Sequence, residues 1–562
     1  MARTVGIGIQ NFEEIRKNNC FYIDKTLFIK EWWERCDSTT LITRPRRFGK
    51  TLNMSMLECF FSVDYADRGD LFEGLSIWEE EKYRKLQGTY PVISLSFANI
   101  KEDNYEATKE KICEVLRGLY IKYSFLLDSD ALIEADRNFF HQVTEAKMKD
   151  TVATSALHQL SNYLYRYYGK KVIILLDEYD TPMQEAYVHG YWDKLVPFTR
   201  SMFNSAFKTN PNLDRGIMTG ITRVSRESIF SDLNHLKVVT ATSNEYADSF
   251  GFTEKEVFAA LEECGLEEEK EKIKYWYDGF VFGKYRDIYN PWSILNFLDT
   301  GIYDVYWANT SANSLVAKLI REGNRRIKMS FERLLQGEHI RCSIEEQIVY
   351  NRLGDNEEAV FSLLVASGYL KVLSYDRADL VEDVMYELAL TNYEVKKMFR
   401  GLVKDWFGTV KADYNDFIKA LLNGNLKEMN AYMNRVALQT FSYFDTGKGP
   451  FGDGPERFYH GFVLGLLVEL SAAYVIISNR ESGFGRYDVM LEPKNKEDKA
   501  FILEFKTYDE EDEEGLKDTV QAALIQIEEK QYESNLIAKG IVAERIYKYG
   551  FAFKGKKVLI GE

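Results

Sequence analysis

Four short apolar runs alternate with amphipathic stretches between residues 21 and 244, and this order limits the fold more than any other feature of the chain. The runs cover residues 41–43, 91–97, 171–177 and 215–221, and residues 52–61 and 151–168 have helical spacing of apolar positions. Alternating strands and helices build parallel sheets with helices on both faces. The sequence therefore predicts a three-layer α/β domain over residues 1–244.

The first apolar run leads into LITRPRRFGKT, residues 41–51, which is similar to a phosphate-binding loop. Such a loop has Gly, four further residues and then Gly-Lys-Ser/Thr before a helix. Gly49, Lys50 and Thr51 fit this pattern, but Arg44 stands where the first glycine is expected. Backbone N–H groups would cradle phosphates, Lys50 would supply charge and Thr51 would hold Mg²⁺. The loop therefore predicts a site for ATP with Mg²⁺.

An acidic pair at the end of the third apolar run supports the same prediction. Asp177 and Glu178 end the run 171–177. At the carboxyl end of a parallel strand, one acid can hold Mg²⁺ through its water shell and a second can orient the attacking water. We assign Asp177 to Mg²⁺ and Glu178 to water activation, with a capped strand end as the structural alternative.

Other polar residues are expected around the phosphates. Arg44 and Arg47 lie within the loop and would add positive charge there. Thr222 and Arg223 follow the fourth apolar run, where a polar sensor of the terminal phosphate is expected. An N-cap threonine and a solvated arginine are an equally good interpretation of these two residues.

The remainder of the chain divides into three parts by its pattern. Residues 245–400 are rich in predicted helices and form a lid and a winged-helix-like region, with a helix and strand at 360–373. Residues 401–450 are interpreted as a helical connector that ends in the Gly- and Pro-rich stretch 446–456. A compact α/β segment follows at 451–562, with strands at 475–478, 487–493, 500–507 and 540–547 and helices at 458–474 and 516–532.

Two acids and a lysine in this last segment have a spacing that points to metal chemistry. Residues two apart on a strand share a face, so Glu504 and Lys506 are predicted to point the same way, and a hairpin would bring Asp488 beside Glu504. Two adjacent carboxylates repel each other unless a cation lies between them, so the pair predicts a Mg²⁺ or Mn²⁺ site for phosphodiester hydrolysis. Lys506 would then orient the nucleophilic water. A surface hairpin with ordinary charges is the structural alternative.

The motifs together resemble the AAA-ATPase-like proteins of bacteria that carry a C-terminal PD-(D/E)xK nuclease domain. This resemblance covers nearly the whole chain, and it implies that Arg44 in place of glycine is a family trait. It also implies that Asp488, Glu504 and Lys506 are the catalytic core and Gln526 a supporting residue. The segments that carry it are FYIDKTLFIKE (21–31), TRPRRFGKTL (43–52), LLDEYDTPM (175–183), TGITRVSRESIFSDLN (219–234), the DGF and YNPWS motifs within 278–293, NRESGFGRYD (479–488), EFK (504–506) and QIEEKQY (526–532).

The resemblance extends to residues without a derived role. Glu481 or Glu456 would be a further acid of the nuclease site. His460 matches a family motif, although a histidine that packs a helix explains it better. Asp24 and Lys25 match a motif at the nucleotide entrance.

Composition narrows the classes of function. The net charge of −15 argues against coating nucleic acid by bulk attraction, so any contact with nucleic acid is expected to be local. No run of about 18 apolar residues and no secretory signal is present, so a cytoplasmic protein without a membrane partner is expected. Six scattered cysteines and six dispersed histidines indicate neither disulfides nor a Cys or His metal cluster.

The sequence thus predicts an ATP-binding, ATP-hydrolysing regulatory module coupled to a Mg²⁺-dependent nuclease, with DNA as the expected substrate. The alternative is an ATP-switched scaffold that binds nucleic acid or protein and does not cut. The sequence leaves open whether the chain forms a homo-oligomer.

Overall fold

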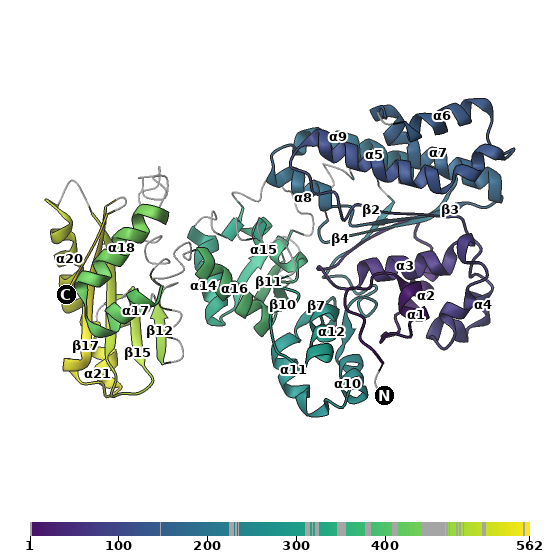
Figure 1. The fold of residues 1–562 in the computed structure, drawn as a ribbon. Helices are drawn as coiled ribbons and strands as arrows, with labels where there is room; N and C mark the ends of the chain where they lie inside the picture. The colour runs from purple at the N-terminus through teal and green to yellow at the C-terminus, as the bar shows by residue number, and fades with distance from the viewer. Residues whose placement is uncertain are drawn as a thin grey trace. The chain divides into compact units, whose positions relative to one another are not determined.

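The computed structural model describes most of the chain in two compact units, Met1–Met398 and Phe399–Glu562 (Figure 1), and each unit is considered by itself. The described residues are 3–145, 148–223, 230, 233, 235–309, 315–316, 319–320, 325–345, 356–376, 384–406, 414–440, 463, 467, 470, 473–478, 481–482, 485–486, 488–508, 513–554 and 557–562.

The first unit is built on a five-stranded sheet with the order β2-β3-β4-β1-β5, in which every pairing is parallel. Strands β1 and β3 are buried along their whole length, as expected for central strands of a covered parallel sheet. The strands are β1 Thr39–Thr43, β2 Val92–Ser96, β3 Val172–Asp177, β4 Leu213–Gly220 and β5 Leu236–Val239.

Helices cover both faces of this sheet, which gives the predicted three layers (Figure 1). The helices on one side are α1 Phe12–Lys17, α2 Leu27–Arg35, α3 Lys50–Phe61 and α4 Glu81–Arg84, and those on the other are α5 Tyr105–Lys122, α6 Glu134–Thr144, α7 Asp150–Tyr168, α8 Thr181–Val188 and α9 Trp192–Phe203. Single turns of 3₁₀ helix cover Val63–Tyr65, Gly69–Phe72, Ser76–Glu79 and Ser124–Asp128, and a π-helical turn covers Asn204–Lys208. The predicted α/β class is confirmed, although the sequence pattern did not reveal β5.

The next part of the first unit contains two small sheets as well as the predicted helices. A sheet of order β6-β8-β7 is formed by β6 Phe252–Thr253, β7 Phe280–Phe282 and β8 Tyr285–Tyr289, with α10 Glu254–Glu263, the turn Glu267–Glu269, α11 Lys270–Tyr277 and α12 Pro291–Thr300 around it. A second sheet of order β10-β11-β9 follows, formed by β9 Ile340–Ser343, β10 Leu370–Asp376 and β11 Met385–Leu390. Its helices are α14 Arg325–Gln336, α15 Glu357–Ala366 and the start of α16 Tyr393–Trp406, a helix that crosses the boundary between the two units at Met398.

Helix α15 and strand β10 account for the helix and strand predicted at 360–373. Every residue of α15 from Ala359 to Val365 is buried, so the helix is covered on all sides. A helix that is apolar around its whole circumference is a core element rather than a surface element.

The second unit is a five-stranded mixed sheet of order β12-β15-β16-β17-β18, in which only β16 and β17 pair in parallel. Its strands are β12 Tyr474–Ser478, β15 Val489–Pro493, β16 Ala500–Thr507, β17 Ile546–Lys554 and β18 Lys557–Gly561, and a separate short hairpin joins β13 Glu481–Ser482 to β14 Gly485–Arg486. Its helices are α17 Tyr414–Asn423, α18 Leu426–Thr440, α20 Leu516–Glu529 and α21 Ser534–Ala538, with a 3₁₀ turn at Ala543–Arg545.

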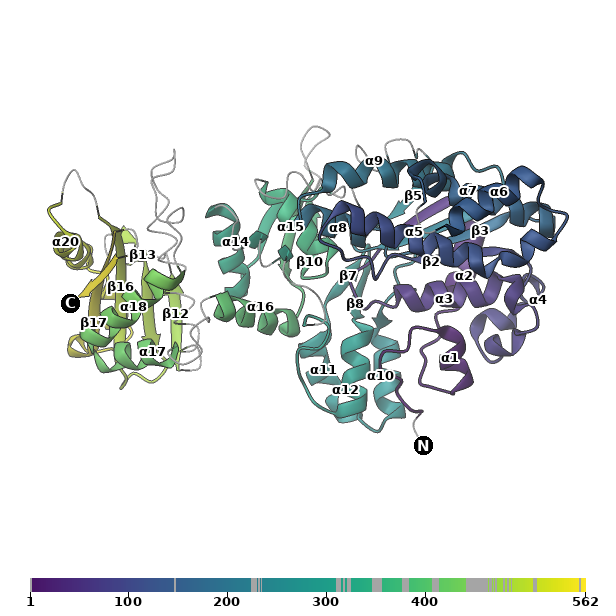
Figure 2. The same cartoon turned by 45° about the horizontal axis from the view of Figure 1, so that its top comes forward.

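The helices predicted as a connector at 401–450 include part of this unit's core. Helices α17 and α18 lie across one face of the sheet (Figure 2), and Phe417, Leu421 and Met433 pack there with Leu503 and Phe551. Their apolar faces need a partner, and the sheet supplies it. This differs from the sequence-based assignment of these residues to a connector.

The last predicted strand also lies elsewhere. The prediction placed it at 540–547, whereas β17 covers Ile546–Lys554 and is followed by β18. A 3₁₀ turn at Ala543–Arg545 interrupts the predicted run, and the alternating sequence YKYGFAFK after it supplies the strand.

Some predicted features lie outside the described residues. These are Glu456, His460, the stretch 446–456 and most of the predicted helix 458–474. Glu481 lies in β13. Among the described helices, none combines the length and the apolar character that crossing a bilayer requires.

Candidate nucleotide and metal sites

The loop after β1 has the backbone shape of a phosphate-binding turn. Gly49 has φ +81° as N-cap of α3, and a side-chain carbon there would meet open space. Arg47 has φ +65°, a left-handed conformation that costs a non-glycine residue about 1 kcal/mol. Helix α3 starts at Lys50, so the loop presents its N–H groups at a helix N-terminus.

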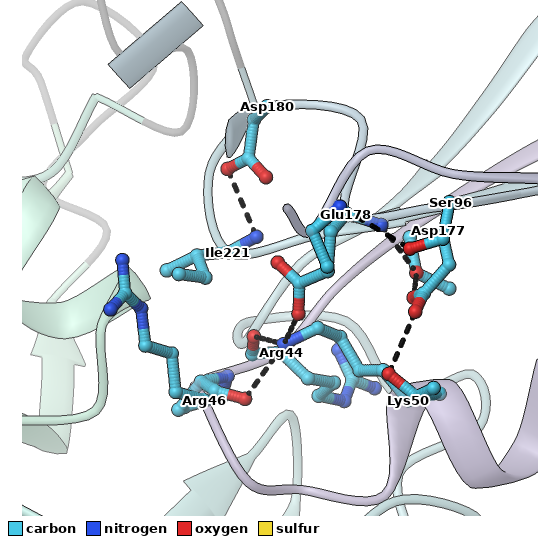
Figure 3. A network of polar contacts seen from close by, with 12 residues as sticks. Arg44, Arg46, Lys50, Ser96, Asp177, Glu178, Asp180 and Ile221 are labelled. Carbon is cyan, nitrogen blue, oxygen red and sulfur yellow. Dashed lines mark hydrogen bonds and ion pairs between the residues drawn. The ribbon is translucent and has the colours of Figure 1, made fainter. Parts of the chain in front are cut away.

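Lys50 is held in place by the loop itself (Figure 3). Its Nζ donates to the carbonyl oxygens of Arg44 and Pro45 at 3.1 Å each and lies 3.3 Å from Oε1 of Glu178. The Lys50 side chain is only 3% exposed. Lys50, which is predicted to bind the terminal phosphate, is therefore paired with Glu178, which is predicted to orient the attacking water.

Arg44 is placed differently from the prediction that its charge surrounds the phosphates. The residue is fully buried, and its guanidinium donates to four backbone carbonyls, those of Thr43, Thr240, Glu245 and Tyr246. Burial lowers the pKa of Arg44 to about 9, so the group remains a cation at neutral pH. The guanidinium also lies 4.5 Å from the centre of the Phe282 ring. Arg44 thus ties the start of the loop to the segment after β5.

Asp177 lies at the carboxyl end of β3 and accepts two hydroxyl hydrogen bonds. Thr51 Oγ1 donates to its Oδ2 at 2.7 Å, and Thr219 Oγ1 of β4 donates to its Oδ1. Strand β4 lies between β1 and β3, so the acid reaches the loop across one intervening strand. Burial and the neighbouring Glu178 raise the pKa of Asp177. The sequence analysis did not assign a role to Thr219, because it lies within the apolar run of β4 and nothing in that run marks it as a partner of Asp177.

Asp180 is a further polar residue that the sequence analysis left without a role. It is fully buried, and its Oδ2 accepts bonds from the Ile221 and Thr222 amides and from Thr222 Oγ1, at 3.0, 2.8 and 2.8 Å. The hydroxyl of the predicted sensor Thr222 is therefore directed at Asp180. Arg223 follows Thr222 at the end of the described stretch and is half-buried.

The two other loop arginines point to different surroundings. Arg47 is exposed and lies over the Trp292 ring at 4.3 Å from its centre. Partial burial and the charge of Arg46 lower its pKa. Arg46 donates to Oε1 of Gln184 at 3.4 Å. Of the three arginines, Arg47 is the one exposed at the loop.

The loop also packs against the part of the first unit that follows the parallel sheet. Asn290 Nδ2 donates to the carbonyl of Arg46 at 3.1 Å, and the Gly251 amide donates to that of Phe48 at 3.3 Å. Gly368, at the turn between α15 and β10, approaches Pro45 so closely that a side-chain carbon there would lie 2.8 Å from Pro45 Cγ. The loop therefore contacts segments that directly precede or follow strands of both small sheets.

Asp24 and Lys25 make structural contacts. Asp24 accepts from the Thr26 hydroxyl and from the Ser76 amide at 2.6 and 2.7 Å, and Lys25 pairs with Glu256 at 2.7 Å. These bonds fix the N-terminal segment to α10 and to the turn at Ser76.

In the second unit the structure brings Asp488 and Glu504 together. Val489 pairs with Leu503 across β15 and β16, which places Asp488 opposite Glu504. Asp488 Oδ2 accepts from the Phe505 amide at 2.9 Å, and Glu504 Oε2 accepts from the Asp488 amide at 3.4 Å. Each carboxylate is thus anchored to the other strand.

Gln526 and Tyr532 extend this group. Gln526 Nε2 donates to Oε1 of Glu504 and also to the hydroxyl of Tyr532, the latter at 3.1 Å. Tyr532 is buried, and burial raises the pKa of its hydroxyl, with the charges of Glu504 and Asp488 acting in the same direction. Tyr532 had no assigned role: the sequence pattern placed it at the end of a helix over 516–532, whereas α20 ends at Glu529.

Lys506 lies two residues along β16 from Glu504 on the same face. Parallel pairing sets Glu504 beside Gly550 and Lys506 beside Ala552, while Leu503, Phe505 and Phe551 pack into the opposite core. Gly550 lets α20 approach the sheet, because a side-chain carbon there would lie 2.8 Å from the Val520 carbonyl oxygen. Glu504 is 3% exposed and Lys506 is half-buried.

The oxygen and nitrogen atoms at the two sites fit the metal ions and the phosphate that the sequence predicts there. At the loop, a hydroxyl and a carboxylate from Thr51 and Asp177 suit Mg²⁺, and the amine of Lys50 suits a phosphate. In the second unit, anchored oxygens of Asp488 and Glu504 suit a hard divalent cation. Glu504 is 3% exposed, and a cation beside its carboxylate would offset the cost of burying that charge.

Comparison with known proteins agrees with this geometry. Residues 6–230 match the family model described as predicted AAA-ATPase, and residues 454–562 match the PD-(D/E)XK nuclease superfamily model. The chain carries an AAA-ATPase-like domain followed by a PD-(D/E)XK nuclease superfamily domain. An uncharacterized protein in the vnfD 5′ region of Azotobacter chroococcum mcd 1 is 25% identical over 395 residues, which are 69% of this chain and 68% of that protein.

The two groups of residues described above fall within these two domains. The AAA-ATPase-like domain contains Lys50, Thr51 and Asp177, and the PD-(D/E)XK domain contains Asp488, Glu504 and Lys506. Helices α17 and α18 precede the matched nuclease segment but pack on its sheet.

Proposed function

We propose that the chain is an ATP-regulated nuclease that needs Mg²⁺ or Mn²⁺ and cuts DNA. The observation that carries this proposal is the mutual anchoring of Asp488 and Glu504 across β15 and β16, with Lys506 on the same face as Glu504. Buried carboxylates that share one face of a sheet are suited to a hard cation.

In this proposal Asp488 and Glu504 hold the metal ion, which when bound polarises the scissile phosphate and lowers the pKa of a water molecule. Lys506 orients that water or stabilises the developing charge. Gln526 keeps the Glu504 carboxylate in its rotamer, and Tyr532 holds the amide of Gln526.

The ATP site would be formed by Gly49, Lys50 and Thr51, with Asp177 and Thr51 holding Mg²⁺. When bound, ATP supplies the terminal phosphoryl group and its charge. Glu178 would then separate from Lys50 and orient the attacking water. The contacts of the loop with Asn290 and Gly368 offer a route by which nucleotide binding alters the rest of the first unit.

The assignment of modules is part of the proposal. Residues 1–244 would form the ATPase, residues 245–400 its lid and winged-helix-like region, and the nuclease would include α17 and α18 besides residues 451–562. The packing of these two helices on the nuclease sheet supports the extension.

The test is incubation of single- and double-stranded DNA and RNA with Mg²⁺ or Mn²⁺, with and without ATP. We expect cleavage of DNA by the wild type, loss of cleavage in Lys506→Ala and loss of the ATP effect in Lys50→Ala. Binding of nucleic acid or protein without metal-dependent cleavage would favour the scaffold instead.

A further inference from the structure

An open pocket of about 400 Å³ lies in the first unit, away from the phosphate-binding loop. Helix α11, the end of α14, strands β10 and β11 and the start of α16 surround it. Its lining includes Tyr275, Tyr393, Lys371, Lys396 and His339.

One wall of the pocket is aromatic. Tyr275 is 62% exposed, and its ring centre lies 4.9 Å from that of Tyr393 with an angle of 30° between the planes. Trp276 supports Tyr393 from the side in an edge contact at 4.7 Å. An exposed tyrosine supported by two further rings is a flat, rigid platform on which a base can stack.

Another wall carries positive charge. Lys371 is half-buried and lines the pocket. Burial lowers its pKa, whereas the charges of Asp278 and Asp287 oppose that shift and favour the cation. Lys396 lies in the same lining, and His339 is paired with Glu387 at 3.1 Å. The acidic residue of the lining, Glu338, is paired with Arg333 at 3.0 Å.

The surrounding fold limits how nucleic acid could bind here. In a winged-helix unit a helix placed in the major groove reads the duplex. Helix α15 cannot do so in this structure, because its residues from Ala359 to Val365 are buried. The pocket instead offers aromatic rings and two lysine side chains, which suit unpaired bases and a single backbone.

We propose that this pocket binds one or two nucleotides of a single-stranded nucleic acid, with a base against Tyr275 and Tyr393 and a phosphate near Lys371 and Lys396. The pocket would hold substrate for the nuclease, and in this respect the proposal rests on the proposed function. It also explains how an acidic protein contacts nucleic acid locally.

The test measures binding of a fluorescein-labelled single-stranded oligodeoxythymidylate of about 15 nucleotides to the full chain in EDTA, by fluorescence anisotropy over a series of salt concentrations. We expect Tyr275→Ala to weaken binding roughly ten-fold and Tyr275→Phe to bind like the wild type. Because Tyr275 is exposed, its replacement leaves the core intact.

The contribution of Lys371 and Lys396 is measured separately, from the salt dependence of binding. Lys371→Ala with Lys396→Ala should weaken binding and reduce the slope of log Kd against log salt by about 0.7 for each lost phosphate contact. Lys255→Ala is the matched control, because Lys255 is an exposed lysine on α10 outside the pocket. Thermal unfolding of each variant checks the fold.

Equal affinity of the wild type and of the Tyr275→Ala and double-lysine variants would overturn the proposal. So would competition by free thymidine monophosphate at the concentration of the oligonucleotide, since the pocket would then be a mononucleotide site. A cleavage assay with Mg²⁺ on the same preparations separates the two proposals. If the oligonucleotide binds in a way that depends on Tyr275 but is not cleaved, the proposed nuclease activity is contradicted. The proposed binding pocket is then still supported.

Discussion

Thr51 Oγ1 donates a 2.7 Å hydrogen bond to Oδ2 of Asp177, a residue 126 positions later in the chain. This bond joins the loop after β1 to the acidic end of β3 and so brings together the hydroxyl and the carboxylate of the proposed Mg²⁺ site. The same end of the sheet carries Lys50 and Glu178 in contact with each other.

Glu178 is expected to act in ATP hydrolysis rather than in ATP binding. Glu178→Gln keeps the size of the side chain but removes the base, so hydrolysis should fall roughly 100-fold while ATP still binds. Lys50→Ala should abolish binding. Calorimetry with Mg²⁺ and ATP and a phosphate-release assay measure the two effects. Hydrolysis by Glu178→Gln at the wild-type rate would remove Glu178 from the mechanism.

Arg44 is expected to matter for stability. Arg44→Ala removes one donor from each of the carbonyls of Thr43, Thr240, Glu245 and Tyr246, and the Thr240 carbonyl keeps a second donor, the Ser243 amide. The free energy of unfolding of the first unit should therefore fall by about 3 kcal/mol. Arg44→Lys should be intermediate, since an ammonium lacks the planar fork. Urea unfolding measures the change. Arg47→Ala is the control, because Arg47 is exposed; equal stability of the two alanine variants would contradict this role.

Glu394 is expected to make stability depend on pH. It is fully buried and accepts from Ser293 Oγ at 2.8 Å and from the Tyr306 and Trp307 amides at 2.7 and 2.9 Å. Burial raises its pKa from 4.5 to about 8, although these donors oppose the shift. The folded state therefore keeps a proton that the unfolded chain releases.

It follows that this contribution to stability is complete below pH 4.5 and is lost as pH rises toward about 8. The thermal midpoint of the wild type should decrease as pH rises from 4.5 to about 8, and the decrease should be smaller in Glu394→Gln. Glu271→Gln, at an exposed glutamate on α11, should leave it unchanged. A wild-type profile that coincides with that of Glu394→Gln would show that Glu394 does not titrate in this window.

Lys506 and Tyr532 are expected to affect cleavage to different degrees. Lys506→Ala should lower the Mg²⁺-dependent rate at least 100-fold, because the amine acts on charge that develops in the reaction. Tyr532→Phe removes one hydrogen bond to Gln526 and should lower the rate only about 2- to 10-fold. Lys530→Ala, at an exposed lysine after α20, is the control. A Lys506→Ala enzyme as fast as the Lys530→Ala control would refute the assignment.

The sequence by itself determined the features that depend on local pattern. Apolar runs of strand length gave β1 to β4, and helical periodicity gave α3 and α7, because burial of one face imposes a period on the sequence. Strand alternation placed Glu504 and Lys506 on one face, and the hairpin placed Asp488 opposite Glu504, since both follow from neighbouring residues.

Tertiary structure alone decided the direction of long side chains and the partners of distant elements. The guanidinium of Arg44 turns inward because the segment after β5, about 200 residues later, presents carbonyls there, and no local pattern encodes that contact. Helices α17 and α18 join the nuclease core for the same reason, since an amphipathic helix specifies an apolar face but not the surface that covers it. Thr219 and Tyr532 likewise became part of the two sites only when the folded chain placed their hydroxyls beside Asp177 and Gln526.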